Sequence, residues 1–147
     1  MEMNTANTAV PLDRSGDLGQ PGRKLRQGWI VITTLLVATF FLEAVFAGAM
    51  LSGVGWARRA HAVAAASLIV STLAAGVFCV VTLRHVRHGP RLGLTLLSLA
   101  AAALLQAALG ALSAKGDNLT WIHVPLGVAL VGLAAQAVSP ARRLGAT

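Results

Sequence analysis

Four long stretches of the chain carry almost no charge, and this spacing limits the fold more than any other feature of the sequence. They cover 29–51, broken only by Glu43, and then 60–83, 92–114 and 118–141. Each reaches the roughly 20 residues that an α-helix needs to cross the hydrocarbon core of a membrane. No alternation of polar and apolar residues indicates strands, and open sheet edges are not stable in lipid. The pattern therefore predicts an all-α integral membrane protein with four transmembrane helices.

Turn-forming residues and short connections set the order of these helices. Gly89 and Pro90 interrupt the chain after the second stretch, and Pro125 is tolerated in the first turn of the last helix. Because the loops are short, consecutive helices must be antiparallel, which predicts an up-down-up-down bundle. We expect the four helices at about 29–51, 57–83, 91–113 and 120–139.

The composition agrees with one membrane domain, which we expect to span 28–140. Of the 147 residues, 56% are hydrophobic and 12% are charged, whereas about a quarter of the residues in a soluble domain are charged. Residues 1–27 are rich in Asn, Thr, Gly and Asp, and we expect a disordered cytoplasmic tail there. A short second tail should cover 141–147.

The single Cys79 excludes an internal disulfide and a metal site built on several thiolates.

Lysine and arginine are unevenly divided between the two ends of the predicted helices. Nine lie on the side that carries both termini and the second loop, and three lie on the other side. We expect the bundle to lie in the plasma (inner) membrane. Positively charged flanks stay in the cytoplasm, so both termini should be cytoplasmic. The basic residues stand beside helix ends, so we expect contact with the lipid bilayer and no nucleic-acid binding.

Trp29 at the inner end, and Trp56 and Trp121 at the outer end, fit aromatic belts.

His61 and His123 each open a predicted helix, and they bear most directly on function. Both lie at the outer face, on the second and fourth helices, which run in the same direction on one diagonal of the bundle. Neutral histidine is a common axial ligand of haem iron. A bare metal ion would need further ligands, whereas a macrocycle supplies four nitrogens itself. The pair therefore predicts a bis-histidine haem b site. The alternative is two interfacial histidines that bond to water or to a neighbouring carbonyl.

Two arginines stand shortly before His61 on the outer side. Arg58 and Arg59 could bind haem propionates, because a guanidinium group forms paired hydrogen bonds with a carboxylate. Equally, they could extend toward lipid phosphates. His85 and His88 lie at the cytoplasmic end of the second helix, where the fourth helix has no histidine opposite. We expect these two to contact water or lipid headgroups.

Glu43 is the only acidic residue within a predicted membrane span. Its carboxyl could face Gln106 across the bundle, relay protons or line a cofactor pocket together with Gln106. A polar clasp between helices is the equal alternative. Glu43 precedes His61 by 18 residues, and Gln106 precedes His123 by 17. This repetition predicts that the bundle consists of two related helical hairpins.

Two short motifs accompany these polar residues. Residues 105–110 read LQAALG and precede His123, and Leu42 and Glu43 with Gly48 form a weaker copy that precedes His61. In these motifs the chain resembles half of a haem A synthase over about residues 29–139. That membrane family consists of duplicated four-helix bundles, with a Leu-Gln-x-x-Leu-Gly-type stretch in odd helices and a haem-ligating histidine at the outer start of even helices. The chain is also similar to small four-helix bacterial membrane proteins with the same Gln/His pattern.

The resemblance implies a four-helix bundle that holds haem iron between His61 and His123. The chain has one bundle where the family has two, and its first outer loop lacks cysteines, so haem modification does not carry over. We expect a haem b protein that acts in electron transfer, haem handling or redox sensing. It could act alone, as a homo-oligomer, or with a redox partner or larger membrane complex. The alternatives are a cofactor-free accessory or structural subunit, and a small four-helix transporter that uses Glu43.

Overall fold

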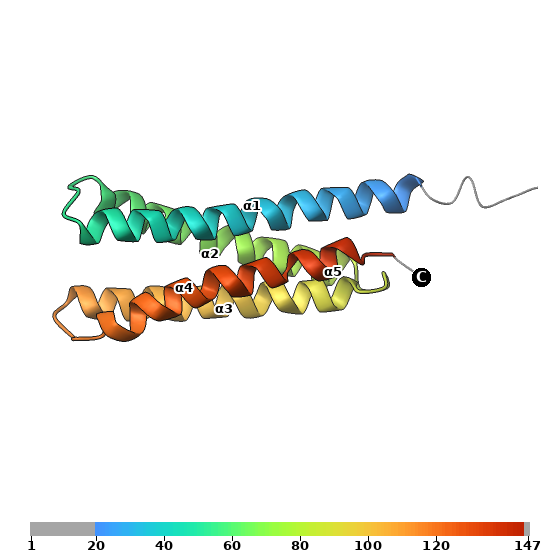
Figure 1. Ribbon diagram of the computed structural model, residues 1–147. Helices are drawn as coiled ribbons and strands as arrows, with labels where there is room; N and C mark the ends of the chain where they lie inside the picture. Colours follow the sequence, from blue (N-terminus) through green and yellow to red (C-terminus); the bar gives the residue numbers. More distant parts are fainter. Residues whose placement is uncertain (1–19, 146–147) are drawn as a thin grey trace, which may run out of the picture.

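Helices account for most of residues 20–145, the part of the chain that the computed structural model describes (Figure 1). The four long helices and the short fifth are α1 (Gln20–Leu51), α2 (Ala57–Thr82), α3 (Gly89–Ala114), α4 (Thr120–Gln136) and α5 (Val138–Arg142). No strand occurs in this described part. The first three helices, and α4 together with α5, are long and apolar enough to cross a membrane. The all-α prediction is confirmed.

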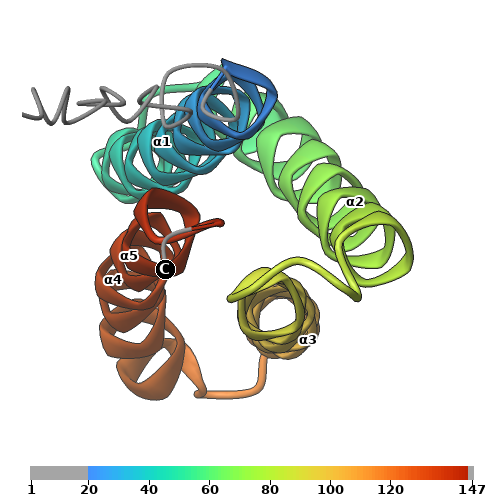
Figure 2. The ribbon, with the colours of Figure 1, turned by 90° about the vertical axis from the view of Figure 1, so that its right-hand side faces the viewer.

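The four long helices form a ring in which each packs against two neighbours (Figure 2). The diagonal pairs, α1 with α3 and α2 with α4, make no backbone contact. The start of α1, the α2–α3 loop and α5 lie at one end of the bundle, here called the terminal end, and the α1–α2 and α3–α4 loops lie at the other, here called the distal end (Figure 1). The expected up-down-up-down bundle is therefore confirmed, with α2 and α4 running in the same direction on one diagonal.

The first helix begins earlier than the sequence predicted, at Gln20 rather than at about Trp29. The later part of the expected tail over 1–27 is therefore helical, and 1–19 lies outside the described residues. Lysine and arginine are good helix formers, and they are frequent just before the membrane span. They extend α1 beyond its apolar part, so the apolar pattern alone underestimates the length of this helix.

The fourth span is interrupted shortly before its end. α4 ends at Gln136, and α5 starts again at Val138. The ring of a proline clashes with the carbonyl four residues earlier in a regular helix, and Pro140 stands in that relation to Gln136. This proline therefore ends α4 a few residues before the expected boundary near residue 139.

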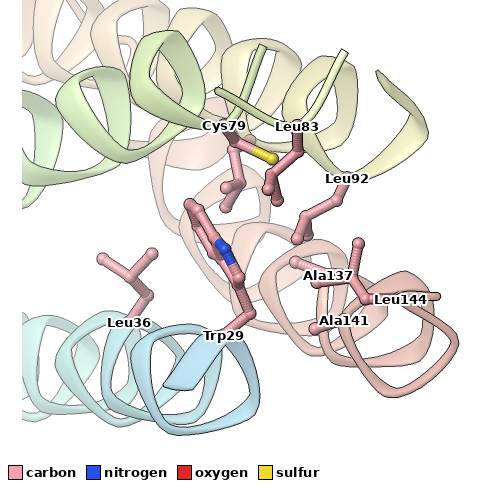
Figure 3. Packing of buried hydrophobic residues seen from close by; sticks show 9 residues of the cluster. Trp29, Leu36, Cys79, Leu83, Leu92, Ala137, Ala141 and Leu144 are labelled. Carbon is pink, nitrogen blue, oxygen red and sulfur yellow. The ribbon is translucent and has the colours of Figure 1, made fainter. Parts of the chain in front are cut away.

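Buried apolar side chains fill the bundle from its terminal end to its middle. A cluster at the terminal end comprises Trp29, Leu36, Cys79, Leu83, Leu92, Leu96, Ala137, Ala141 and Leu144 (Figure 3). A second cluster comprises Phe40, Leu68, Leu99, Ala103, Leu130 and Ala134. Trp29 is only 3% exposed, so it belongs to the core and not to an aromatic belt, whereas Trp56 and Trp121 are exposed at the distal end.

The outer surface of all four long helices is apolar. Large exposed side chains that point away from the core include Leu35, Phe41, Val70, Leu104 and Val128. A soluble monomer rarely exposes so much apolar surface. The surface is compatible with contact to the hydrocarbon core of a lipid bilayer.

Candidate functional site

One cavity lies between the four long helices in the distal half of the bundle. Its volume is about 210 Å³, far more than the roughly 10–15 Å³ that a single water molecule needs. Small and apolar side chains form most of its lining. The polar side chains among them are Glu43, His61, Gln106 and His123, one from each long helix. The cavity begins where the packed core ends. Four residues of the second core cluster also line the cavity, namely Phe40, Leu68, Ala103 and Leu130.

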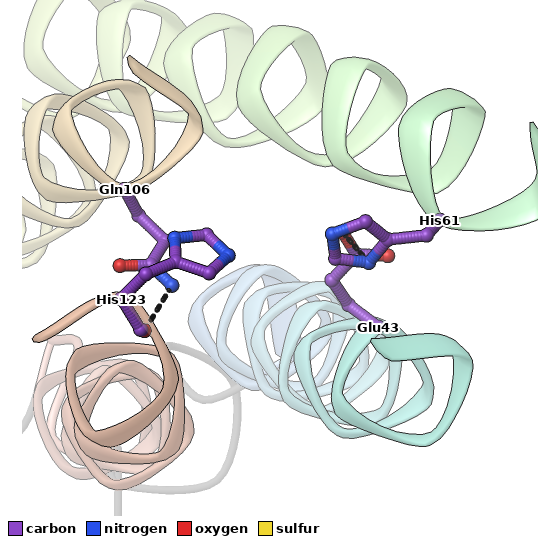
Figure 4. A network of polar contacts seen from close by, with 4 residues as sticks. All are labelled: Glu43, His61, Gln106 and His123. Carbon is purple, nitrogen blue, oxygen red and sulfur yellow. Dashed lines mark hydrogen bonds and ion pairs between the residues drawn. The ribbon is translucent and has the colours of Figure 1, made fainter. Parts of the chain in front are cut away.

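His61 lies one turn into α2, and its ring points into the bundle (Figure 4). Ala57, the first residue of α2, is fully buried and holds this end of the helix against the bundle. Nδ1 of His61 lies 3.0 Å from Oε1 of Glu43 on α1, with the two side chains 20% and 16% exposed. The two atoms are at ion-pair distance, but they are not aligned as a hydrogen bond. Glu43 therefore faces the histidine of the neighbouring helix.

His123 has a corresponding partner in the second hairpin. The side-chain amide of Gln106 on α3 donates a hydrogen bond of 2.7 Å from Nε2 to the backbone carbonyl of His123 on α4. His123 lies in the first turn of α4, where its backbone N–H bonds to the carbonyl of Leu119. Because Gln106 bonds to the backbone of His123 and not to its ring, the imidazole is free to point into the cavity (Figure 4).

Two glycines make room for this second pair. A Cβ atom on Gly110 would lie 2.8 Å from Cε1 of His123, and a Cβ atom on Gly127 would lie 2.9 Å from Nε2 of Gln106. Real Cβ atoms do not come this close to another heavy atom. The imidazole of His123 therefore rests directly on the backbone of α3, and the amide of Gln106 rests on that of α4. The sequence placed Gly110 in a motif and among the small residues of the third helix that permit close approach, but it did not predict these two contacts or single out Gly127.

The four polar side chains of the cavity carry buried atoms without a hydrogen-bond partner in the protein. They are Oε2 of Glu43, Nδ1 of His61, Oε1 of Gln106 and Nδ1 of His123. Buried polar atoms are paired in the great majority of cases, and each exception calls for an explanation. Here one atom from each long helix lacks a partner within the same cavity. Such a concentration is typical of a site that receives a ligand or water.

The structure brings together four of the six site residues that the sequence predicted. The rings of His61 and His123 point toward one another across the cavity, with Glu43 and Gln106 beside them (Figure 4). Arg58 and Arg59 lie in the first turn of α2, where they are exposed and do not line the cavity. Contact between these arginines and a ligand would require that ligand to extend beyond the cavity.

The arrangement limits which metal species the site could hold. Among residues 20–145, no three His, Cys, Asp or Glu side chains come together as a metal-binding group. A bare ion such as zinc requires three or four protein ligands. Two opposed imidazoles would instead suit a macrocyclic cofactor, which supplies the other ligands of its metal itself.

The chain was compared with protein-family models, with curated protein sequences and with solved structures, and none of them matches.

Proposed function

We propose that the protein is a small integral membrane protein that binds haem b, and that His61 and His123 would hold its iron. One observation carries this proposal: two imidazoles, from helices on a diagonal of the bundle, face each other across a single apolar cavity (Figure 4). Neutral imidazole is a common ligand of haem iron, and two such ligands complete its coordination.

The residues around the histidines fit a flat apolar cofactor. Small side chains face the cavity from all four long helices and leave room beside the rings: Ala44, Ala47, Gly48, Ala65, Ala107 and Gly127. The volume of about 210 Å³ is below the range of about 300–1,000 Å³ that is typical of ligand pockets. The proposal therefore requires the lining helices to move apart when haem binds.

Glu43 would act on the site through His61. A carboxylate beside the second ring nitrogen of a histidine ligand fixes its tautomer and orientation and makes it a stronger donor. The separation of 3.0 Å between Nδ1 of His61 and Oε1 of Glu43 fits this role. Among residues 20–145, no carboxyl group lies at ion-pair distance from Nδ1 of His123, and its neighbour Gln106 bonds to the backbone of His123 instead. The two histidines would therefore differ in how strongly they donate to the iron.

When bound, haem would supply one-electron redox chemistry. The protein would then act in electron transfer, haem handling or redox sensing in a bacterial inner (plasma) membrane, with both termini cytoplasmic. The distal end, where the histidines lie, would face outward. Arg58 and Arg59 lie at this end, so they would meet the propionates only where those extend past the helices.

A cofactor-free accessory or structural subunit is the second candidate, and one observation favours it. Glu43 reaches His61 on α2, and Gln106 reaches His123 on α4. Each hairpin is therefore joined by a polar contact that could serve as a clasp alone. The same pairing disfavours a transporter that uses a free Glu43 carboxyl.

Haem content distinguishes these candidates. The full chain would be purified from membranes in neutral detergent, and its haem would be quantified per polypeptide before and after titration with haem b. The proposal predicts saturation at one haem per chain. A chain that is folded and helical by circular dichroism but takes up no haem would contradict the proposal and favour the clasp.

A further inference from the structure

A second hollow lies at the terminal end of the bundle, between α3 and the α4–α5 segment. Its volume is about 290 Å³. Its lining contains three basic side chains and three neutral polar ones, namely His88, Arg91, Arg143, Thr95, Gln136 and Ser139. It shares no lining residue with the cavity between the histidines. Its properties therefore do not depend on the proposed haem site.

A third hollow continues from the second toward the middle of the bundle. Its volume is about 520 Å³, and it shares Arg91, Thr95 and Gln136 with the second hollow. Its further lining includes Leu94, Leu99 and Leu133. The two hollows together form one groove, here called the α3–α4 groove, which is basic at the end of the bundle and apolar toward the membrane interior.

Among residues 20–145, no acidic side chain lies near the basic end of this groove. Within residues 20–145 the acidic residues are Glu43 and Asp117. Glu43 lies beside His61, and Asp117 lies in the α3–α4 loop at the distal end. Arg91 and Arg143 form no ion pair within this described part of the chain. The basic end is therefore complementary to an anion.

We propose that the α3–α4 groove binds one anionic phospholipid, with its phosphate at Arg91 and Arg143 and an acyl chain along Leu94, Leu99 and Leu133. Basic pockets between transmembrane helices bind anionic headgroups, and arginine suits phosphate because of its planar fork of donors. The apolar continuation selects a lipid over a soluble phosphate. This groove opens at the helix ends, the depth at which a headgroup lies.

Native mass spectrometry of the full chain, released from neutral detergent, tests this proposal. The protein would be titrated with dioleoyl phosphatidylglycerol or dioleoyl phosphatidylcholine. We expect preferential binding of one phosphatidylglycerol, and we expect Arg91→Gln combined with Arg143→Gln to weaken it about tenfold or more. The matched control is Arg84→Gln with Arg87→Gln, which removes equal charge from exposed positions at the same end but outside the groove.

Three outcomes would overturn the proposal. Equal binding of the two lipids would exclude recognition of the anionic headgroup. Equal weakening by both double variants would indicate a general field of positive charge. Displacement of the lipid by soluble glycerol phosphate would indicate an anion site without an acyl component. Leu133→Gln, which changes only the apolar part, is expected to weaken phosphatidylglycerol binding without altering the helix content of the protein.

Discussion

The side-chain amide of Gln106 bonds to the backbone carbonyl of His123 over 2.7 Å, and it thereby ties α3 to α4 at the residue whose imidazole faces the cavity. A neighbouring contact in the first hairpin joins Glu43 to the ring of His61. The two hairpins thus use the same pair of positions in different ways. In one, a carboxylate meets the histidine side chain, and in the other an amide meets the histidine backbone.

Gln106→Leu should lower both the affinity for haem and the thermal stability of the bundle. The substitution removes a donor from a partly buried hydrogen bond, whose net contribution to stability is typically about 0.5–1.5 kcal/mol. Because the same bond positions His123, we expect haem affinity to fall about tenfold. Thermal unfolding and haem titration would measure the two effects. Gln27→Leu, at an exposed position of α1, is the control and should change neither quantity. Unchanged haem affinity in Gln106→Leu would remove this residue from the site.

Gly110→Ala should displace the ring of His123. The added methyl group would lie 2.8 Å from Cε1 of that ring, so the imidazole must move away from α3. We expect weaker haem binding by about tenfold, as for other changes that misorient a ligand. Gly132→Ala is the matched control on α4, since a Cβ atom on Gly132 would have nothing within 4 Å and alanine favours a helix by up to about 1 kcal/mol. Identical haem titrations for the two variants would contradict the arrangement.

Two substitutions of Glu43 distinguish a residue that only joins two helices from one that also changes the midpoint potential of bound haem. Glu43→Gln keeps the shape of the side chain and restores the symmetry with Gln106, so we expect normal folding. Glu43→Ala should be less stable, because it leaves His61 without its neighbour. A carboxylate near the iron stabilises the oxidised form and so lowers the midpoint potential. With haem bound, Glu43→Gln should therefore raise the midpoint potential. Redox titration would measure this shift. An unchanged potential would leave Glu43 with a structural role only.

Topology follows from the uneven distribution of lysine and arginine. The described ends of the chain lie at the same end of the bundle, which carries most of the basic residues of the flanks. Reporter fusions at the N-terminus and after Arg143 should both report the cytoplasm, and a fusion in the α1–α2 loop should report the outside. Opposite locations for the two termini would contradict a chain that crosses the membrane four times.

The membrane explains why so much of this fold could be predicted from the sequence. Lipid requires each spanning segment to satisfy its own backbone hydrogen bonds, so uncharged length alone indicates a helix. The starts of α2 at Ala57 and of α4 at Thr120 agree with that prediction. The start of α1 does not, because its first part is polar and lies outside the apolar pattern on which the prediction rests.

The contacts of the site depend on packing that no residue spacing reveals. The sequence singled out Glu43, His61, Gln106 and His123, and the structure lines one cavity with all four. It could not show that Glu43 meets His61, because the rotation of each helix about its axis sets that contact. Nor could it show that Gly110 and Gly127 contact side chains of the facing helix, since those contacts depend on how the helices pack.

The spectrum of the haem-loaded chain and its histidine variants tests the central claim most directly. Electron paramagnetic resonance and visible spectra would be recorded for the full chain, for His61→Ala and for His123→Ala. The control combines His85→Ala with His88→Asn, since residue 88 has a φ of 65° and asparagine tolerates that conformation. We predict six-coordinate low-spin iron in the wild type and in the control, and loss of this signal in each single variant. A wild type that binds no haem, or a low-spin signal that survives both single substitutions, would contradict the account.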